Sequence, residues 1–330
     1  MQNEMKNWSI SPKIISEEAK KMWFKVEIIS PAKNFFYVEN KNKKVFFKSI
    51  DCWLNSSYWF RVSEDKELTY KLCELYKLKI PKTKIFSYDE NIENILEEVK
   101  DFKFPLVSKP VDWAHWDWVS VNISGKEELE NAVNYSRKFT KANIILQEQI
   151  NWKDHRILVV WDKVVAWAMR IPPYVIWNSE KTIEELIEEE NKNPKRWGGD
   201  DHDSIMSKIR IDKELEGAIE EKWYKLEDKL EEWKKLFVRK NCNLSTWWLS
   251  IDITNKIHPE TKKMCIELAK ICSLKIAWID IICEDISKPL EEINGAIIEV
   301  NSTPWIRMHH FPSEWKSRNV AKEILELVFV

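Results

Sequence analysis

The chain has 330 residues with 44% hydrophobic and 32% charged side chains, and its formal net charge is −2. This composition is typical of a globular protein with enough apolar residues for a sizeable core. The balanced charge gives no electrostatic reason to expect nucleic acid or an anionic membrane as a partner. No stretch approaches the ~20 apolar residues of a membrane-spanning helix, and the N-terminus lacks the apolar core of a secretory signal.

The leading region, residues 1–62, is of mixed character. It contains two apolar runs with strand-like composition, at 25–30 and 43–50. In the segment that follows, leucines recur at helical spacing and predict a helix that ends before Pro81. We therefore expect a short leading region followed by one main domain over 63–330.

The main domain alternates predicted strands and helices along its whole length. Strands are expected where apolar runs occur, at 83–88, 104–110, 143–150, 155–160, 163–171, 275–283 and 295–300. Helices are expected at 90–100, 126–139, 259–272 and 317–328, and the charged segment 179–235 is expected to be mostly helical and solvated. This mixture predicts an α+β fold of α/β type.

Cysteine usage favours a reducing compartment. The six cysteines are scattered without a Cys-x-x-Cys pair, so we expect neither a disulfide framework nor a zinc site. Together with the missing secretory signal, this predicts a cytoplasmic protein. The oligomeric state stays open, with a homo-oligomer as one option.

The counts of glycine and tryptophan are abnormal. The chain has 5 Gly and 19 Trp, whereas average usage would give roughly 23 Gly in a chain of this length. The deficit of glycine nearly matches the excess of tryptophan. We infer that most Trp letters stand where the natural protein has Gly, as when a gene that reads the opal codon as glycine is translated by the standard code. The alternative is a genuinely Trp-rich protein, for example one that stacks sugars.

Local context supports the glycine interpretation. Trp161 follows one apolar run and, with Asp162, joins it to the next, which is a position for tight-turn residues. Other tryptophans cluster with neither helical nor strand periodicity, at 113, 116, 118, 247, 248 and 305. Bulky residues avoid the positive φ angles that such turns require.

A glycine-rich loop is predicted after the strand that ends at Lys109 and Pro110. With Gly in place of Trp, segment 111–120 could present consecutive backbone N–H groups to a phosphate, and Lys109 would add a positive charge. A plain mobile turn is the alternative.

Three oxygen-bearing side chains predict a magnesium site. Glu299 and Asn301 are two residues apart on one strand and therefore share a face, and Asp280 lies on the neighbouring predicted strand. Mg²⁺ prefers such oxygen ligands and bridges them to substrate phosphates. The alternative is three hydrogen-bonded polar residues at strand ends, although a carboxylate among apolar residues is costly unless it is paired.

Two further acidic residues suit a nucleoside. Glu148, at the end of an apolar strand, could accept a hydrogen bond from an adenine amino group, and Asp154 could reach a ribose hydroxyl. Solvation of an ordinary strand edge explains both residues equally well.

Taken together, these segments resemble the ATP-grasp superfamily, and in particular the ATP-grasp module of the cyanophycin synthetases. The resemblance covers about residues 60–330 once Trp is read as Gly, and it rests on KPVDWAHWDWVSVNI, DHRILVVWDKVVAWAMRI, AWIDIIC and IIEVNSTPWIRMHHFPSEW. The chain is also similar, more distantly, to the ATP-grasp part of fused glutathione synthetases and to D-alanine–D-alanine ligases. The resemblance implies an ATP-grasp fold with a lid subdomain, about 104–165, and a C-terminal subdomain.

The resemblance also implies roles for individual residues. Lys66 and Lys109 would contact the phosphates of ATP, and Glu148 with the backbone near Ile150 would hold adenine. The lid loop would bind the nucleotide through Asp112, His115, Asp117 and Ser120. Two Mg²⁺ ions would be bound by Asp280, Glu299 and Asn301.

Three residues are candidates for catalysis at the reacting carboxylate. Arg239 and Arg307 could stabilise the charge of an acyl phosphate, and the resemblance favours a substrate-facing role for His309. Surface or structural roles are the alternatives for all three. His202 lies in a charged loop without a second histidine at ligand spacing, so we interpret it as a solvated loop residue.

The expected function is ATP-dependent ligation of a carboxylate to an amine through an acyl phosphate. No Ser/His/Asp or Cys/His arrangement indicates a side-chain nucleophile, so positioning and charge would supply the catalysis. The substrates would be amino acids or peptides. The alternatives are a glutathione-synthetase-like or D-alanine-ligase-like dipeptide ligase, or a non-catalytic ATP-binding partner of a separate ligase.

Overall fold

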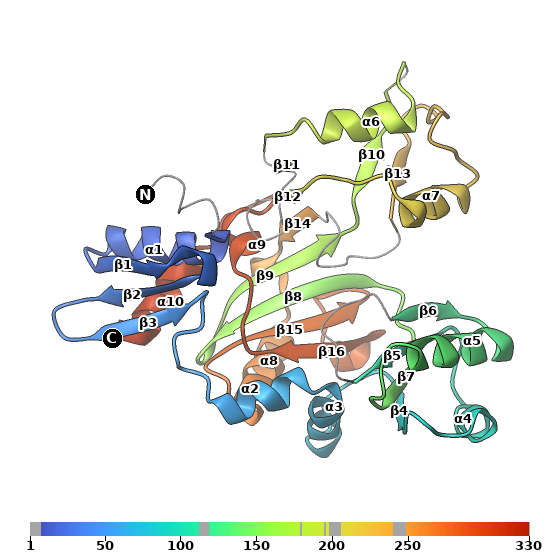
Figure 1. Ribbon diagram of the computed structural model, residues 1–330, viewed down its shortest axis with the longest axis horizontal. Coiled ribbons are helices and arrows are strands. Elements are labelled where there is room, and N and C mark those ends of the chain that lie inside the picture. The colour runs from blue at the N-terminus through green and yellow to red at the C-terminus, as the bar shows by residue number, and fades with distance from the viewer. Residues whose placement is uncertain are drawn as a thin grey trace. The chain divides into compact units, whose positions relative to one another are not determined.

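A computed structural model describes residues 8–111, 119–178, 180–194, 196–197, 206–239 and 249–329 (Figure 1). The chain forms two compact units that are interleaved in sequence. Unit 1 comprises residues 1–53, 166–253 and 305–330, and unit 2 comprises 54–165 and 254–304. The sequence suggests a leading region, 1–62, followed by a main domain, 63–330. This division of the chain stays a prediction.

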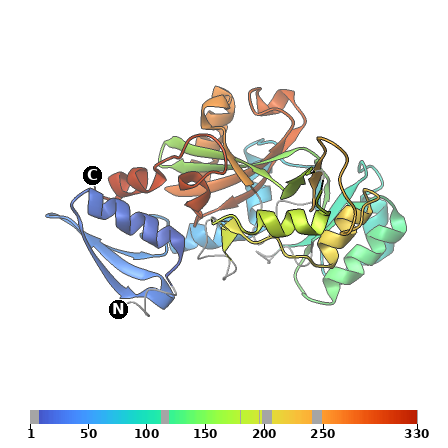
Figure 2. The ribbon, with the colours of Figure 1, turned by 90° about the horizontal axis from the view of Figure 1, so that it is seen from above.

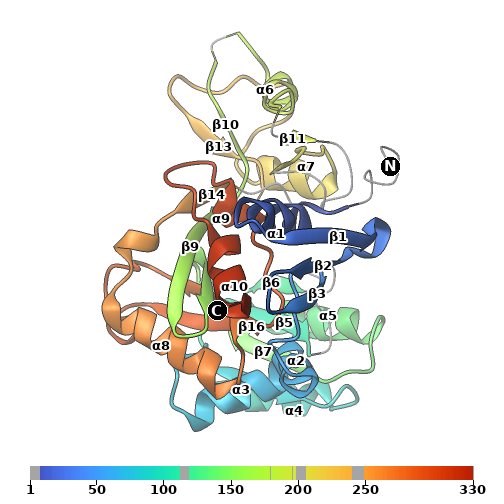
Figure 3. The same cartoon turned by 90° about the vertical axis from the view of Figure 1, so that its left-hand side faces the viewer.

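Unit 1 contains a three-stranded antiparallel sheet with two helices. The sheet has the order β1-β2-β3, and helix α1 packs against both β1 and α10 (Figures 2 and 3). The elements are α1 (Ile10–Lys21), β1 (Lys25–Ser30), β2 (Phe35–Glu39), β3 (Lys44–Lys48) and α10 (Val320–Phe329). The strands confirm both apolar runs of the leading region. Helix α1 was not predicted, because its buried face includes Ser11, Ser16 and Glu18 and shows little hydrophobic periodicity.

The rest of unit 1 is built from short elements. Strand β9 (Lys163–Ile171) runs from unit 2 into unit 1, where it pairs with β14 (Leu249–Asp252). The remaining strands are β10 (Tyr174–Ile176), which pairs with β13 (Lys235–Phe237), and β11 (Arg196–Trp197), which pairs with β12 (Met206–Ser207). The helices are α6 (Ile183–Glu190), α7 (Lys213–Glu220) and α9 (Arg307–His310).

The prediction that segment 179–235 is mostly helical is wrong. Its described part contains two eight-residue helices, α6 and α7, separated and followed by turns and irregular segments. Helix α7 ends in a turn in which Trp223 has a φ of 64°, and Trp233 turns the chain again with a φ of 62°. Many charged side chains of this segment are exposed, as its high charge indicated. Charge alone, however, contains no signal for the positions at which the chain reverses direction.

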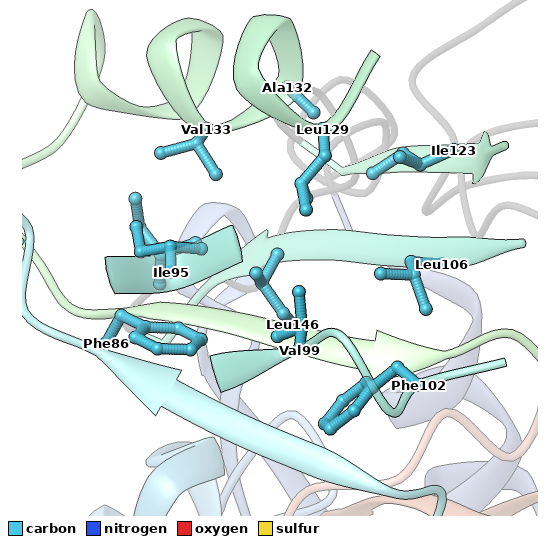
Figure 4. Close-up of a cluster of buried hydrophobic side chains, with 11 residues drawn as sticks. Phe86, Ile95, Val99, Phe102, Leu106, Ile123, Leu129, Ala132, Val133 and Leu146 are labelled. Carbon is cyan, nitrogen blue, oxygen red and sulfur yellow. The ribbon is translucent and has the colours of Figure 1, made fainter. Parts of the chain in front are cut away.

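Unit 2 contains a four-stranded antiparallel sheet with the order β4-β7-β5-β6. Its strands are β4 (Thr83–Phe86), β7 (Ile144–Glu148), β5 (Leu106–Pro110) and β6 (Ser120–Ile123), and its helices are α4 (Ile92–Glu98) and α5 (Lys126–Arg137). Leu129, Ala132 and Val133 of α5 point toward the strands, where they join one buried cluster with Leu106 and Leu146 (Figure 4). This core fixes the strand ends that carry Lys109 and Glu148.

The other sheet strands of unit 2 carry the remaining predicted site residues. Strand β15 (Ile276–Cys283) lies between β8 (Lys153–Val160) and β16 (Gly295–Asn301) and pairs antiparallel with both. Helices α2 (Ser57–Glu64) and α3 (Lys66–Leu75) pack against β16, and α8 (Pro259–Ile271) packs against β8 and β15 (Figure 1). Short 3-10 turns occur at η2 (Pro31–Lys33), η4 (Thr254–Lys256) and η5 (Leu290–Glu292).

Strands occur in every segment where the main domain was expected to have them, and the helices predicted at 90–100, 126–139, 259–272 and 317–328 are present with somewhat different ends. The mixture of helices with mostly antiparallel sheets confirms the α+β class. In the part of the chain that the structure describes, no helix is long and apolar enough to cross a membrane.

Among the residues that the structure describes, six tryptophans adopt the left-handed backbone conformation that favours glycine. They are Trp23, Trp53, Trp161, Trp223, Trp233 and Trp315, with φ between 57° and 72°. Trp23 and Trp223 follow the ends of α1 and α7, where the residue after each donates its N–H five positions back (Phe24 to Ala19 and Tyr224 to Ile219). This is the helix-ending motif in which glycine usually takes the left-handed position. Both side chains are 95% exposed, so no packing explains an indole there.

Gly295 occupies a position with no room for a side chain. A Cβ atom there would lie 2.5 Å from Cys283 Cβ and 2.8 Å from Leu290 Cδ1. We expect Gly295→Ala to lower the free energy of unfolding by about 1–3 kcal/mol, the usual cost of overpacking. Urea unfolding of the two proteins measures the difference. Gly125→Ala is the matched control because nothing lies within 4 Å of its Cβ position, and equal stability of the Gly295 variant would contradict the packing argument.

Candidate functional site

Helix α3 brings a lysine next to a carboxylate of β16. Lys66 is the first residue of α3, and Asp65 caps the helix by accepting a hydrogen bond from the Leu68 N–H. The Lys66 ammonium lies 3.5 Å from Glu299 Oε1, and the side chains are 13% and 25% exposed. The pair is therefore partly shielded from water, yet still accessible to a ligand.

Lys109 is buried at the end of β5 and is held by a tyrosine of α3. Its ammonium donates a hydrogen bond of 2.8 Å to Tyr70 Oη, and Tyr70 in turn donates one of 2.7 Å to the carbonyl of Ile298 on β16. Burial lowers the pKa of Lys109 to about 8, and the negative charge of Glu299 partly opposes this shift. Burial raises the pKa of Tyr70, which keeps its hydroxyl protonated.

One face of the sheet formed by β8, β15 and β16 carries a charged row. Asp280 on β15 lies opposite Glu299 on β16 and opposite Arg156 on β8. Arg156 donates two hydrogen bonds, of 2.8 Å and 2.7 Å, to the two carboxylate oxygens of Asp280. Its guanidinium also lies 3.8 Å from the centre of the Trp278 ring. Both members of this ion pair are buried, so the pairing offsets the cost of removing the charges from water.

Asn301 completes the set of oxygen-bearing groups. It lies two residues beyond Glu299 on β16 and opposite Trp278, so its side chain is on the same face as Asp280. Its amide nitrogen is buried and has no hydrogen-bond partner among the described residues. Two carboxylates and an amide oxygen on one sheet face fit Mg²⁺, which prefers oxygen ligands. The structure thus brings together the three predicted metal ligands, and adds Arg156 and Lys66 as their neighbours. No group of three or more His, Cys, Asp or Glu side chains suited to a metal occurs in the described ranges. The set proposed here has two carboxylates, and its third oxygen belongs to Asn301.

The predicted nucleoside contacts lie on β7, β8 and the segment between them. Glu148 ends β7, and its Oε1 accepts a hydrogen bond of 2.9 Å from the Lys103 N–H. Ile150 and Asp154 are half-buried, the latter on β8. Ser120 begins β6 opposite Ser108 of β5. Asp112, His115 and Asp117 lie outside the described residues, as does His202.

The three candidate catalytic residues belong to unit 1. Arg239 is 1% exposed, and its guanidinium is bound by the carboxylates of Asp212 and Glu214. Arg307 and His309 are both buried in the short helix α9. The predicted lysines and carboxylates belong to unit 2, and the catalytic roles of these three residues stay predictions.

Sequence reasoning missed Tyr70 and Arg156. The leucine spacing on α3 indicated the wrong face of the helix as the buried one. The buried residues are Thr69, Tyr70 and Cys73, whereas Leu68 and Leu75 are exposed. The available signal for Tyr70 was its position four residues after Lys66, which places both on one side of a helix. For Arg156, the signal was a cation inside an apolar strand, since a buried charge needs a partner.

The scaffold under this site matches a known family. Residues 63–172 match the RimK-like ATP-grasp domain, and that range contains Lys66, Tyr70, Lys109 and Arg156. This chain carries an ATP-grasp domain. The fold and the superfamily that the sequence motifs indicated are therefore confirmed.

Relatives of this ATP-grasp chain are longer proteins. It is 35% identical over 266 residues to a cyanophycin synthetase of Crocosphaera subtropica, covering 80% of this chain and 30% of that protein. It is 29% identical over 327 residues to a glutathione biosynthesis bifunctional protein of Clostridium perfringens, covering 97% of this chain and 41% of the relative. The chain thus spans less than half the length of these relatives.

A solved structure shows the same fold. The bifunctional glutathione synthetase from Pasteurella multocida superposes with a TM-score of 0.77 at 20% identity, covering 98% of this chain and 44% of that one. The likeness extends across both units of the ATP-grasp chain, including the leading region that the sequence motifs do not cover.

Proposed function

We propose that this chain is an ATP-dependent ligase that joins a carboxylate to an amine and forms an amide bond. The observation that carries the proposal is the cluster of Lys66, Lys109, Glu299, Asp280 and Asn301 on an ATP-grasp scaffold. Arg156 also lies beside this cluster, because it pairs with Asp280. With Lys66 and Lys109 it makes three cations against two carboxylates, so the site has an excess of positive charge. Such a cluster suits a polyphosphate better than a neutral ligand.

Each group in the cluster has a proposed role toward ATP. Lys109 and Lys66 bind and orient the phosphates as charged donors, while Glu148 and Asp154 accept hydrogen bonds from adenine and ribose. Asp280, Glu299 and Asn301 would hold Mg²⁺, which supplies neutralisation of phosphate charge when bound. The 2.8 Å contact between Arg156 and Asp280 fixes one of these carboxylates in place.

The proposed reaction needs no nucleophilic side chain. The substrate carboxylate attacks the γ-phosphate of ATP and releases ADP, and an amine then displaces phosphate from the acyl phosphate. The residues of the chain contribute orientation, charge and exclusion of water. The substrates are proposed to be amino acids or peptides, in line with the names of the relatives, and neither nucleic acid nor membrane is proposed as a partner.

A dipeptide ligase and a non-catalytic nucleotide binder are the competing functions. A ligase releases phosphate from ATP only when a carboxylate and an amine are added, whereas a binder releases none under any condition. The test uses the chain with glycine at the six left-handed tryptophan positions and at 113, 116, 118, 247, 248 and 305, and this chain is the parent of every variant below. It measures phosphate release with Mg²⁺ and ATP, with and without a pool of the twenty amino acids and a set of dipeptides. Release that depends on the pool supports the proposal, and removing members one by one then identifies the class of substrate.

The pKa of Lys109 gives a pH dependence of ATP binding. Because the group loses its proton near pH 8 in the free protein, ATP affinity is expected to fall as pH rises above about 8, by at most tenfold per pH unit. The dissociation constant for ATP measured by calorimetry from pH 7 to 9.5 checks this. Lys109→Met should bind ATP weakly with a flat profile over the same range, and an equally steep profile in that variant would contradict the assignment.

A further inference from the structure

We propose that Tyr70 is a positioning residue for Lys109: its hydroxyl holds the lysine ammonium in place for phosphate and ties it to β16 beside Glu299. The inference rests on the proposed function, since it concerns the same ATP site. Neither the sequence motifs nor the comparisons assign a role to Tyr70.

The hydrogen bonds around Tyr70 have a defined direction. A phenol has one proton to donate, and the 2.7 Å contact to the Ile298 carbonyl is much shorter than the 3.5 Å contact to Gln147 Oε1. The proton therefore goes to Ile298, which leaves a lone pair of Oη for the Lys109 ammonium at 2.8 Å. The Gln147 side chain has another hydrogen-bond partner, because its amide N–H donates to Thr83 Oγ1 at 2.8 Å.

Burial makes this contact important for Lys109. The lysine is 7% exposed and Tyr70 is 3% exposed, so water is largely excluded from both. A buried ammonium is costly without a hydrogen-bond acceptor, and a lysine stem is flexible unless its end is held. Tyr70 supplies the acceptor, and its ring adds a second contact, since the ammonium lies 5.2 Å from the ring centre.

One helix thereby organises both proposed phosphate contacts. Lys66 and Tyr70 are four residues apart on α3 and face the same side. Lys66 reaches the side chain of Glu299, and Tyr70 reaches the backbone of the preceding residue, Ile298. The position of α3 therefore sets the placement of Lys66 directly and that of Lys109 through Tyr70.

The test is Tyr70→Phe, which keeps the ring and removes the hydroxyl. We expect the dissociation constant for ATP to rise about tenfold, the usual effect of losing one hydrogen bond to a charged group. Affinity for adenosine should stay unchanged, because Lys109 acts on phosphates. Tyr37→Phe is the matched control, since Tyr37 is also a buried tyrosine but donates its hydrogen bond to Glu27 in unit 1. It should bind ATP as the parent does.

A double-variant comparison shows whether the effect passes through Lys109. In the Lys109→Met background, Tyr70→Phe should cause no further loss of ATP affinity. Tyr70→Met is measured alongside as a second variant without the hydroxyl, with circular dichroism as the check of folding, and it should reproduce the loss for ATP.

The outcomes separate the two proposals. If the parent chain does not bind ATP, the proposed function itself fails. If the parent binds ATP and Tyr70→Phe binds it equally well, the positioning role is wrong. An equal loss for ATP and adenosine, or an undiminished loss in the Lys109→Met background, would also overturn it, because the hydroxyl would then act on the fold in general.

Discussion

Glu299→Gln is expected to abolish turnover and leave the fold intact. The substitution keeps the size of the side chain but removes the negative charge that lies 3.5 Å from Lys66 and opposite Asp280. A site for Mg²⁺ that loses one of two carboxylates binds the cation poorly, and metal stabilisation of phosphate charge contributes several kcal/mol to catalysis. We therefore expect ADP formation to fall by at least about a hundredfold.

The design of this experiment follows from the contacts around the two carboxylates. Asp280 is a poorer choice, because its loss would leave the buried guanidinium of Arg156 without its ion-pair partner and would destabilise the fold. Glu97→Gln serves as the control, since Glu97 pairs with Lys100 on the surface of unit 2. Mg²⁺-dependent ADP formation is compared in the three proteins, with circular dichroism to verify folding. Equal activity of parent and Glu299→Gln would reject the metal assignment.

Replacing tryptophan by glycine at the six left-handed positions is expected to stabilise the protein substantially. The cost of a bulky residue at positive φ is roughly 1–2 kcal/mol per site, so six sites approach the total stability of ~5–15 kcal/mol that domains have. Five of these side chains are more than 70% exposed: Trp23, Trp53, Trp223, Trp233 and Trp315. Removing them also removes apolar surface that promotes aggregation.

The predicted phosphate loop, 111–120, is also expected to need glycine in place of tryptophan. Indoles at 113, 116 and 118 would occupy the space that phosphates need, so the chain with tryptophan at these positions and at 247, 248 and 305 is expected to be insoluble or inactive. A version with glycine at all twelve positions is expected to be soluble and to bind ATP. Soluble yield and calorimetry with ATP compare the two versions.

A control separates the backbone effect from the mere loss of indoles. Trp59 lies within helix α2, where glycine costs about 1 kcal/mol, so Trp59→Gly alone should not stabilise the chain. Reading the codons is an independent check, and we expect the opal codon at the six left-handed positions. If the tryptophan version is as soluble and binds ATP as well as the glycine version, the glycine interpretation loses its physical support.

The sequence predicted those parts of the site that depend on strand periodicity. Glu299 and Asn301 share a face because side chains alternate along a strand, and the apolar run around Asp280 identified its strand. The pairing of Asp280 with Glu299 across two strands follows from the antiparallel register, which the sequence suggests but does not fix.

Other parts of the structure depend on contacts between distant segments. The pairing of Arg156 with Asp280 joins residues 124 positions apart, and no local pattern reveals it. The burial of Tyr70 reflects the way α3 packs on β16, and helix propensity contains no information on which face is covered. The interleaving of the two units depends likewise on strand β9 leaving one unit and entering the other.

If the chain forms an acyl phosphate from ATP and a carboxylate, hydroxylamine should trap this species as a hydroxamate. The full chain with glycine at the twelve positions is incubated with Mg²⁺, ATP, hydroxylamine, and the amino-acid and dipeptide pool, and the nucleotide products and hydroxamates are measured together. We expect ADP and phosphate in equal amounts together with a hydroxamate, and none of the three products above background with Glu299→Gln. Formation of AMP and pyrophosphate, or ADP formation without any hydroxamate, would contradict it.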